Sequence, residues 1–145
     1  MPGTEVKHIM LRNIVGIIVG LIVGGIVNMA LIMVSSALIP PPSGADITTV
    51  EGLRAAIPLL EPKHFVFPFL AHALGTFAAA LIACVIAVSH KTTIALLIGV
   101  LFLIGGIAAS MMIPAPTWFK ALDLVVAYIP MAWLGGKLGG AGKEA

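Results

Sequence analysis

The chain has 145 residues, of which 60% are hydrophobic and only 10% are charged. A soluble globular domain carries about 25% charged residues, so this composition excludes an ordinary soluble fold. The formal net charge of +2 is too small and too scattered for a nucleic-acid partner, and the single cysteine, Cys84, excludes an intrachain disulfide. We expect one membrane domain that covers residues 1–145.

Residues 1–13 are polar, and we expect them to be frayed or interfacial. The first apolar segment, residues 14–36, contains no charge and is long enough to cross a bilayer. Basic residues precede it, as in a signal peptide, but a signal-peptide core is only about 7–15 residues long. The segment is therefore predicted to be a retained transmembrane helix.

Within this first helix, Gly16, Gly20 and Gly24 recur every four residues, and the next step of four is Asn28. Residues four apart share one face of a helix. Glycine on such a face lets two helix backbones approach closely in lipid. The pattern, a glycine zipper, predicts a smooth packing surface that ends in one buried amide.

A long connection, residues 37–64, follows, and the run of prolines near its start ends the first helix. Thr48, with Glu51 three residues later, forms a capping-box pattern. We therefore expect a short amphipathic helix at about 49–57 that lies at the membrane surface as an ordered cap. The alternative is a lid that gates a substrate path.

Three further apolar segments predict helices at 65–88, 92–113 and 117–136, each close to the roughly 20 residues that a bilayer core requires. Small residues with packing potential occur in the first two of these segments: Gly75, Ala79, Ala83, Gly105 and Gly106. We expect the 14–36 and 65–88 helices to form a tightly packed antiparallel pair. The alternatives are a face along which a helix slides and a contact between copies of the chain.

Basic residues near the helix ends predict the orientation in the membrane. One side would hold Lys7, Arg12, Lys91, Lys137 and Lys143, and the other Arg54, Lys63 and Lys120. This excess favours both termini in the cytoplasm and the long connection outside. The sequence thus predicts an all-α integral membrane bundle of four transmembrane helices in a bacterial inner membrane.

Three side chains inside the predicted helices do not belong in hydrocarbon: Asn28, His72 and Asp123. At 1.5 Å per residue, all three lie roughly 9–12 Å below the outer surface, so they can meet if they face inward. Such a cluster, extended inward by Tyr128, can carry a proton, bind a cation or hold a polar ligand. In the structural alternative, Asp123 pairs with Lys120, His72 bonds a backbone carbonyl, and Asn28 links two helices.

Pro130 is expected to weaken the last helix near mid-membrane and to free a backbone carbonyl. One histidine and one aspartate are too few for a catalytic zinc site, and the sequence has no phosphate loop or dinucleotide fingerprint. We therefore expect no metal and no cofactor, and we lean towards a protein that is not an enzyme.

In overall pattern, the chain resembles the small, uncharacterised bacterial membrane proteins that have four helices. This likeness of architecture implies no particular activity. Residues 69–77 (FLAHALGTF) also resemble the helix of the fluoride-channel family in which an asparagine is followed by Gly-Ser-Phe, with His72 in the place of the asparagine. The other motifs of that family and its near-balanced flanking charges are not matched.

Three functions remain open. We favour a structural, accessory or assembly protein that packs through its small-residue faces. The second is a small transporter or channel for a proton, an ion or a small polar solute, and the third is a subunit that binds a haem or quinone through His72. The expected partners are the lipid bilayer and either further copies of the chain or a larger membrane complex.

Overall fold

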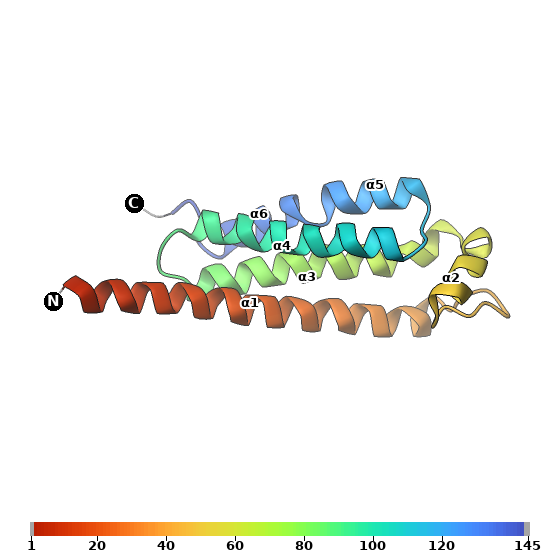
Figure 1. Ribbon diagram of the computed structural model, residues 1–145, viewed down its shortest axis with the longest axis horizontal. Helices are drawn as coiled ribbons and strands as arrows, with labels where there is room; N and C mark the ends of the chain where they lie inside the picture. Colours follow the sequence, from red (N-terminus) through yellow and green to blue (C-terminus); the bar gives the residue numbers. More distant parts are fainter. Residues whose placement is uncertain (1, 144–145) are drawn as a thin grey trace.

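The computed structural model describes residues 2–143, and all regular structure in this range is helical. Four helical segments are long and apolar enough to cross a membrane: Gly3–Leu38, Pro62–Ile86, Lys91–Met112 and Thr117–Leu138. They lie side by side along one long axis (Figure 1). The prediction of an all-α bundle with four candidate transmembrane segments is confirmed.

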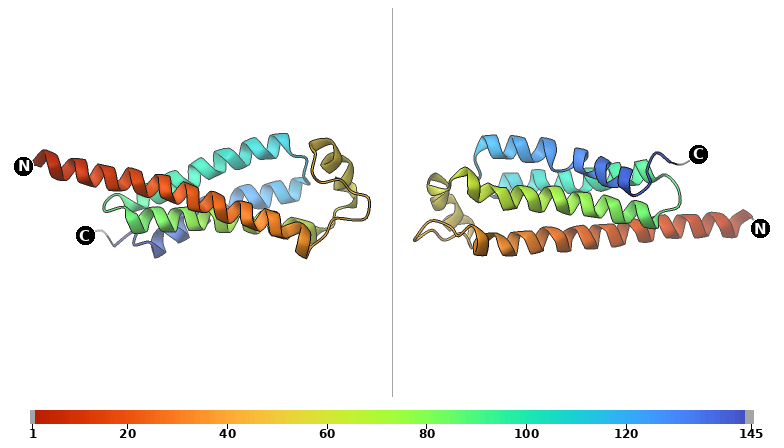
Figure 2. Two further views of the ribbon diagram at one scale, coloured as in Figure 1. Left: turned by 90° about the horizontal axis from the view of Figure 1, so that it is seen from below. Right: turned by 180° about the vertical axis from the view of Figure 1, so that it is seen from behind.

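The first helix, α1 (Pro2–Leu38), is longer than predicted. Residues 2–13 belong to it, so the expectation of a frayed start was wrong. Glu5 lies in the first turn, where a negative charge interacts favourably with the helix dipole. Its 37 residues extend for about 55 Å, which exceeds a hydrocarbon core of about 30 Å. The N-terminal turns project beyond the other helices (Figures 1 and 2).

The glycine face of α1 packs against α3 (Val66–Ile86). Among the α1 residues whose side chains are described, the three buried ones are all glycines. A Cβ added to any of the three would lie 2.5–2.8 Å from a carbonyl oxygen of α3, closer than real side chains approach. The contacts are Gly16 with Ala83, Gly20 with Ala79, and Gly24 with Gly75. This face is therefore used inside the chain.

The two glycines predicted for α4 (Lys91–Met112) behave differently from each other. A Cβ added to Gly105 would meet nothing within 4 Å, so the expectation that Gly105 packs is wrong for contacts within the described chain. Gly106 lies directly against the ring of Tyr128 and has no room for a side chain. Gly99, another small residue of the segment predicted at 92–113, packs against Ala132.

The last candidate membrane span is two helices, α5 (Thr117–Val126) and α6 (Ile129–Leu138), rather than the single helix predicted at 117–136. Pro130 lies in the first turn of α6, where it cannot donate a hydrogen bond to the carbonyl of residue 126. The chain breaks at Ala127 and Tyr128, whose exposed fractions are only 0% and 2%. Irregular backbone at membrane depth is tolerated where protein covers it.

The long connection closes one end of the bundle (Figure 1) with α2 (Val50–Ala56) and two 3₁₀ turns, η1 (Ile57–Leu59) and η2 (Pro62–Phe65). The N-cap of α2 is Thr49, whose hydroxyl oxygen accepts a hydrogen bond from the Gly52 amide, rather than Thr48. Thr48 bonds Asp46 through its side chain and its amide, and these bonds hold the pKa of Asp46 below its ordinary value.

At the opposite end, polar residues of α1 hold the turn between α3 and α4. Arg12 donates a hydrogen bond to the carbonyl of Ile86, the last residue of α3, at 3.0 Å. Asn13 accepts one from the Val88 amide at 3.1 Å and donates one to the Ser89 hydroxyl at 3.0 Å. These bonds fix the position of α1 along α3, which in turn sets the depth of each polar residue.

Candidate functional site

Three of the four predicted polar residues meet. His72 projects from α3, Asp123 from α5, and Tyr128 lies at the break between α5 and α6. The His72 Nδ1 atom is 2.9 Å from both carboxylate oxygens of Asp123, and the Tyr128 hydroxyl donates to Oδ2 at 3.0 Å. The rings of His72 and Tyr128 stack with their centroids 5.8 Å apart.

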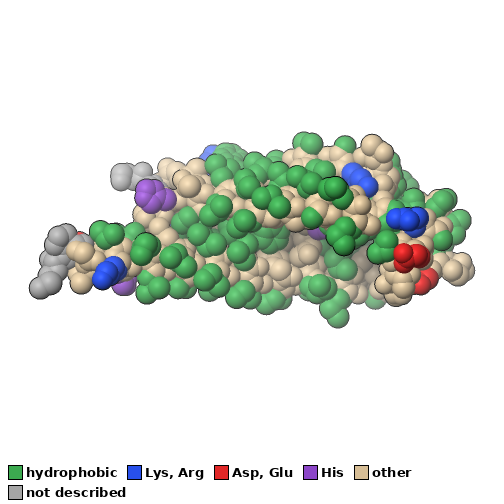
Figure 3. All heavy atoms as spheres, in the orientation of Figure 1, with side chains coloured by type: hydrophobic (Ala, Val, Ile, Leu, Met, Phe, Trp, Pro, Cys, Tyr) green, Lys and Arg blue, Asp and Glu red, His purple; other side chains and the backbone are tan. Residues whose placement is uncertain are grey.

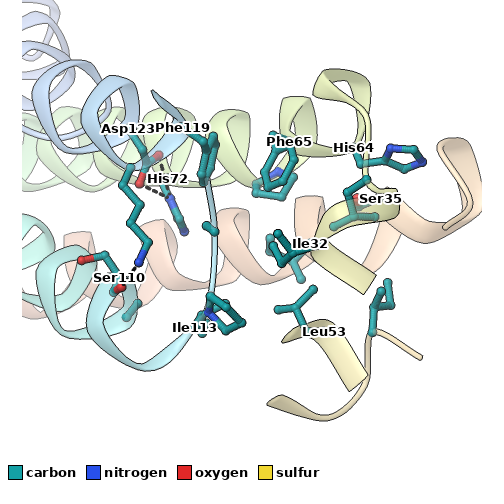
Figure 4. A pocket seen from close by; sticks show the side chains of 18 of the residues that line it. Ile32, Ser35, Leu53, His64, Phe65, His72, Ser110, Ile113, Phe119 and Asp123 are labelled. Atoms are coloured by element: carbon teal, nitrogen blue, oxygen red, sulfur yellow. Dashed lines mark hydrogen bonds and ion pairs between the residues drawn. The ribbon is translucent and has the colours of Figure 1, made fainter. Parts of the chain in front are cut away.

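This hydrogen bonding determines which atoms stay available. An ionised carboxylate only accepts hydrogen bonds, so the His72 Nδ1–H donates to Asp123 and the Nε2 atom remains for another partner. The Asp123 side chain is only 7% exposed, whereas that of His72 is 27% exposed. The carboxylate is therefore covered by its two partners, and the imidazole is the accessible member of the pair (Figure 4).

Asn28 does not join these residues. It lies against Gly75, one turn of α3 away from His72. Its buried Oδ1 atom has no hydrogen-bond partner among the described residues. The structure thus places Asn28 at the α1–α3 contact, where its Oδ1 atom makes no bond between the helices.

Lys120 does not pair with Asp123, which removes one of the structural alternatives. Its Nζ atom donates to the carbonyl oxygen of Ser110, in the last turn of α4, at 2.6 Å. Within residues 2–143, no carboxylate oxygen lies within 4.0 Å of this ammonium group. His72 likewise bonds a carboxylate rather than the backbone carbonyl considered in that alternative.

A partly open cavity of about 350 Å³ adjoins this cluster and is lined by residues of α1, α3, α4, α5 and the long connection. Its size falls in the range of about 300–1,000 Å³ that is typical of small-molecule sites. Apolar side chains form most of its wall, and Figure 4 labels five of them: Ile32, Leu53, Phe65, Ile113 and Phe119. The cavity also exposes a few polar side chains, notably those of His72, Asp123 and Lys120.

The cavity occupies one end of the bundle. Its lining residues come from 32–72 and 106–124, so they lie in the half of the molecule nearest the long connection. On the face drawn in Figure 3, hydrophobic side chains cover the middle of the molecule, and the surface is hollowed between α4 and α1. The hollow adjoins surface that would face lipid in a membrane.

Aromatic rings border the cavity beside its polar end. The Phe65 ring of η2 lies 4.9 Å from the Phe119 ring of α5 and 5.5 Å from the Trp118 ring, measured between centroids. This contact holds the start of α3 against the start of α5. Because His72 and Asp123 lie one to two turns beyond these positions, the same contact helps to set their separation.

The sequence did not reveal the position of Lys120 on the cavity. Lys120 precedes Asp123 by three residues, so both were expected on the same side of a helix. The structural alternative took this spacing as an ion pair, although the same spacing also allows two side chains that line one cavity without pairing. His64 also lines the cavity, and its Nδ1 accepts a hydrogen bond from the Glu61 amide at 2.9 Å.

The described residues contain no group of three or more His, Cys, Asp or Glu side chains that could hold a metal ion. Comparison with protein-family models, curated protein sequences and solved structures gave no match. The chemistry of the site is therefore derived from its own residues. They provide a hydrogen-bonded imidazole–carboxylate pair and an ammonium group at one end of an apolar space.

Proposed function

We propose that this chain is a multi-pass membrane protein that binds a small amphipathic molecule from the bilayer. The observation that carries the proposal is the His72–Asp123 pair, which opens onto an apolar cavity of about 350 Å³. Binding sites for small molecules are mostly apolar and have a few convergent polar groups that orient the ligand. Ionisable groups within a membrane are costly, so they commonly mark such sites.

The use of the glycine face favours a binding role over assembly. Gly16, Gly20 and Gly24 are already packed against α3 of the same chain, so this stripe is not available to a partner. In the sequence, a structural or assembly protein was supported by the small-residue packing surfaces, of which this stripe is one, and by the lack of a catalytic motif. Homo-oligomers or larger complexes would need another surface, such as the exposed apolar side of α1.

A transporter is the second candidate, and the break between α5 and α6 favours it. Discontinuous transmembrane helices form the substrate sites of several transporter folds, because a broken helix offers free backbone groups near mid-membrane. Here the side-chain hydroxyl of Tyr128, which lies at the break, donates a hydrogen bond to Asp123. The cavity lies in one half of the bundle, as expected for a substrate site that opens to one side of the membrane at a time.

For the orientation, we propose that both termini are cytoplasmic and that the capped end faces outward in a bacterial inner membrane. The excess of basic residues at the other end supports this orientation. The cavity would then lie in the outer leaflet, beneath α2. A ligand would reach it sideways from lipid, through the hollow between α4 and α1.

The test is native mass spectrometry of the purified protein, titrated with hexadecanol and with hexadecanoic acid. Ala109→Phe fills the cavity, because Ala109 lines it. Its neighbour Ala108 is exposed and does not line the cavity, so Ala108→Phe is a matched control. We expect one saturable adduct per chain in the wild type and the control, and its loss in Ala109→Phe. Equal adducts in all three proteins would contradict the proposal.

A further inference from the structure

We infer that the ligand is a single-chain carboxylic acid whose carboxyl group binds between Lys120 and His72. This inference rests on the proposed function, since it names the class of molecule that the cavity holds. Two observations lead to it: an ammonium group without a counter-ion, and an imidazole whose outer nitrogen is available, both on the same apolar cavity.

Lys120 supplies the positive charge. An ammonium group has three N–H donors, and one of them is used on the Ser110 carbonyl. A lysine near the end of a transmembrane helix normally extends its charged end towards water. Lys120 is instead partly buried and lines the cavity, with no carboxylate of residues 2–143 within 4.0 Å. Its remaining donors suit an oxygen of a ligand.

His72 supplies an acceptor. Because its Nδ1–H is donated to Asp123, the Nε2 atom of the neutral ring can accept a hydrogen bond. A protonated carboxyl group matches this arrangement, since its O–H can donate to Nε2 while its carbonyl oxygen accepts from Lys120. The alkyl chain would extend along the wall that includes Ile32 and Leu53.

The charges balance when the acid arrives in its neutral form. Before binding, the site carries one positive charge on Lys120 and one negative charge on Asp123, which form no ion pair with each other, and the His72 ring carries none. The carboxyl proton then passes to His72 Nε2, which leaves a carboxylate beside Lys120 and an imidazolium beside Asp123. The site has no net charge before or after this step, so no uncompensated charge is buried.

Asp123 explains why the proton would be accepted. It is held by the Tyr128 hydroxyl at 3.0 Å and by His72 at 2.9 Å, and it is only 7% exposed. An imidazolium formed at His72 would donate a charge-assisted hydrogen bond to this carboxylate. Asp123 is thus a positioning residue, and it does not itself touch the ligand.

The test measures the binding of hexadecanoic acid, its methyl ester and hexadecanol to purified protein by competition in native mass spectrometry. We expect the acid to bind roughly 10- to 100-fold more tightly than the ester, since hydrogen bonds to charged groups are worth about 1.5–3 kcal/mol. Lys120→Met should remove this preference, and Lys120→Arg should retain most of it. Lys63→Met is the control, because Lys63 is exposed and does not line the cavity.

The proton transfer has its own readout. Infrared difference spectra of hexadecanoic acid labelled with ¹³C at the carboxyl carbon should show a carboxylate in the wild type. In His72→Gln, the bound acid should keep its protonated carbonyl band. A protonated acid in the wild type would overturn the proton-transfer step.

The outcomes separate this inference from the proposed function. Equal binding of the acid, ester and alcohol, or an unchanged preference in Lys120→Met, would overturn the carboxyl inference and leave the binding function intact. Failure of all three molecules to bind would overturn the proposed function itself. Tighter binding of phosphatidylserine than of the free acid would overturn the assignment to a single-chain ligand.

Discussion

The packing of α1 on α3 predicts that alanine substitutions at two glycines of α1 have different effects on stability. Gly20 contacts α3 closely, whereas Gly25 does not. A Cβ at Gly20 would lie 2.5 Å from the Ala79 carbonyl oxygen, whereas ordinary contacts begin at 3.4 Å, so the two helices must move apart by roughly 0.9 Å. Overpacking of this kind costs about 1–3 kcal/mol. Alanine also gains up to about 1 kcal/mol over glycine in a helix. Gly20→Ala should therefore lower the free energy of unfolding by about 1–2 kcal/mol.

The matched control is Gly25→Ala, since a Cβ at Gly25 meets nothing within 4 Å. This variant gains the helix propensity without the clash, so it should be neutral or up to about 1 kcal/mol more stable. Reversible unfolding in mixed micelles, followed by circular dichroism, measures both. Equal stabilities for the two variants would refute the close contact between α1 and α3.

Two further predictions concern the polar cluster and the orientation. Tyr128→Phe keeps the ring against Gly106 but removes a hydrogen bond to a buried carboxylate. It should therefore lower the free energy of unfolding by about 1.5–3 kcal/mol in the same assay. An unchanged free energy of unfolding would contradict that bond. Ser43→Cys in the long connection should react with an impermeant thiol reagent added to intact cells, whereas Lys143→Cys should react only after lysis. Labelling of position 143 in intact cells would contradict the proposed orientation.

The features that follow from spacing along one helix could be predicted from the sequence. The length of each apolar run predicts the four candidate spans, and the four-residue repeat of glycine predicts a face on which α3 can approach. Depth could also be estimated, because a helix rises 1.5 Å per residue. That estimate placed His72 and Asp123 in one layer, and the structure brings their side chains to 2.9 Å.

The features that depend on helix rotation and on backbone irregularity could not be predicted. Asn28 shares the estimated depth but lies at the α1–α3 contact, because depth says nothing about which way a side chain faces. Pro130 predicted a weak point, and the break lies just before it, at Ala127 and Tyr128; that the helix is fully interrupted there depends on buried surroundings that stabilise non-helical backbone. Lys120 has a backbone carbonyl of α4 as its partner, and no pattern within one helix identifies such a partner.

The central claim is that a ligand binds in this cavity. The most direct test is to identify the residues to which a ligand analogue attaches. Hexadecanoic acid that carries a photoreactive diazirine in its chain can be irradiated with the protein in bilayers, and the labelled residues can be identified by mass spectrometry. We expect the label at cavity residues such as Ile32, Ile113 and Phe119. An excess of hexadecanoic acid without the diazirine should suppress this labelling. Labelling confined to the exposed outer face of α1, such as Ile18 and Ile22, would contradict a binding cavity.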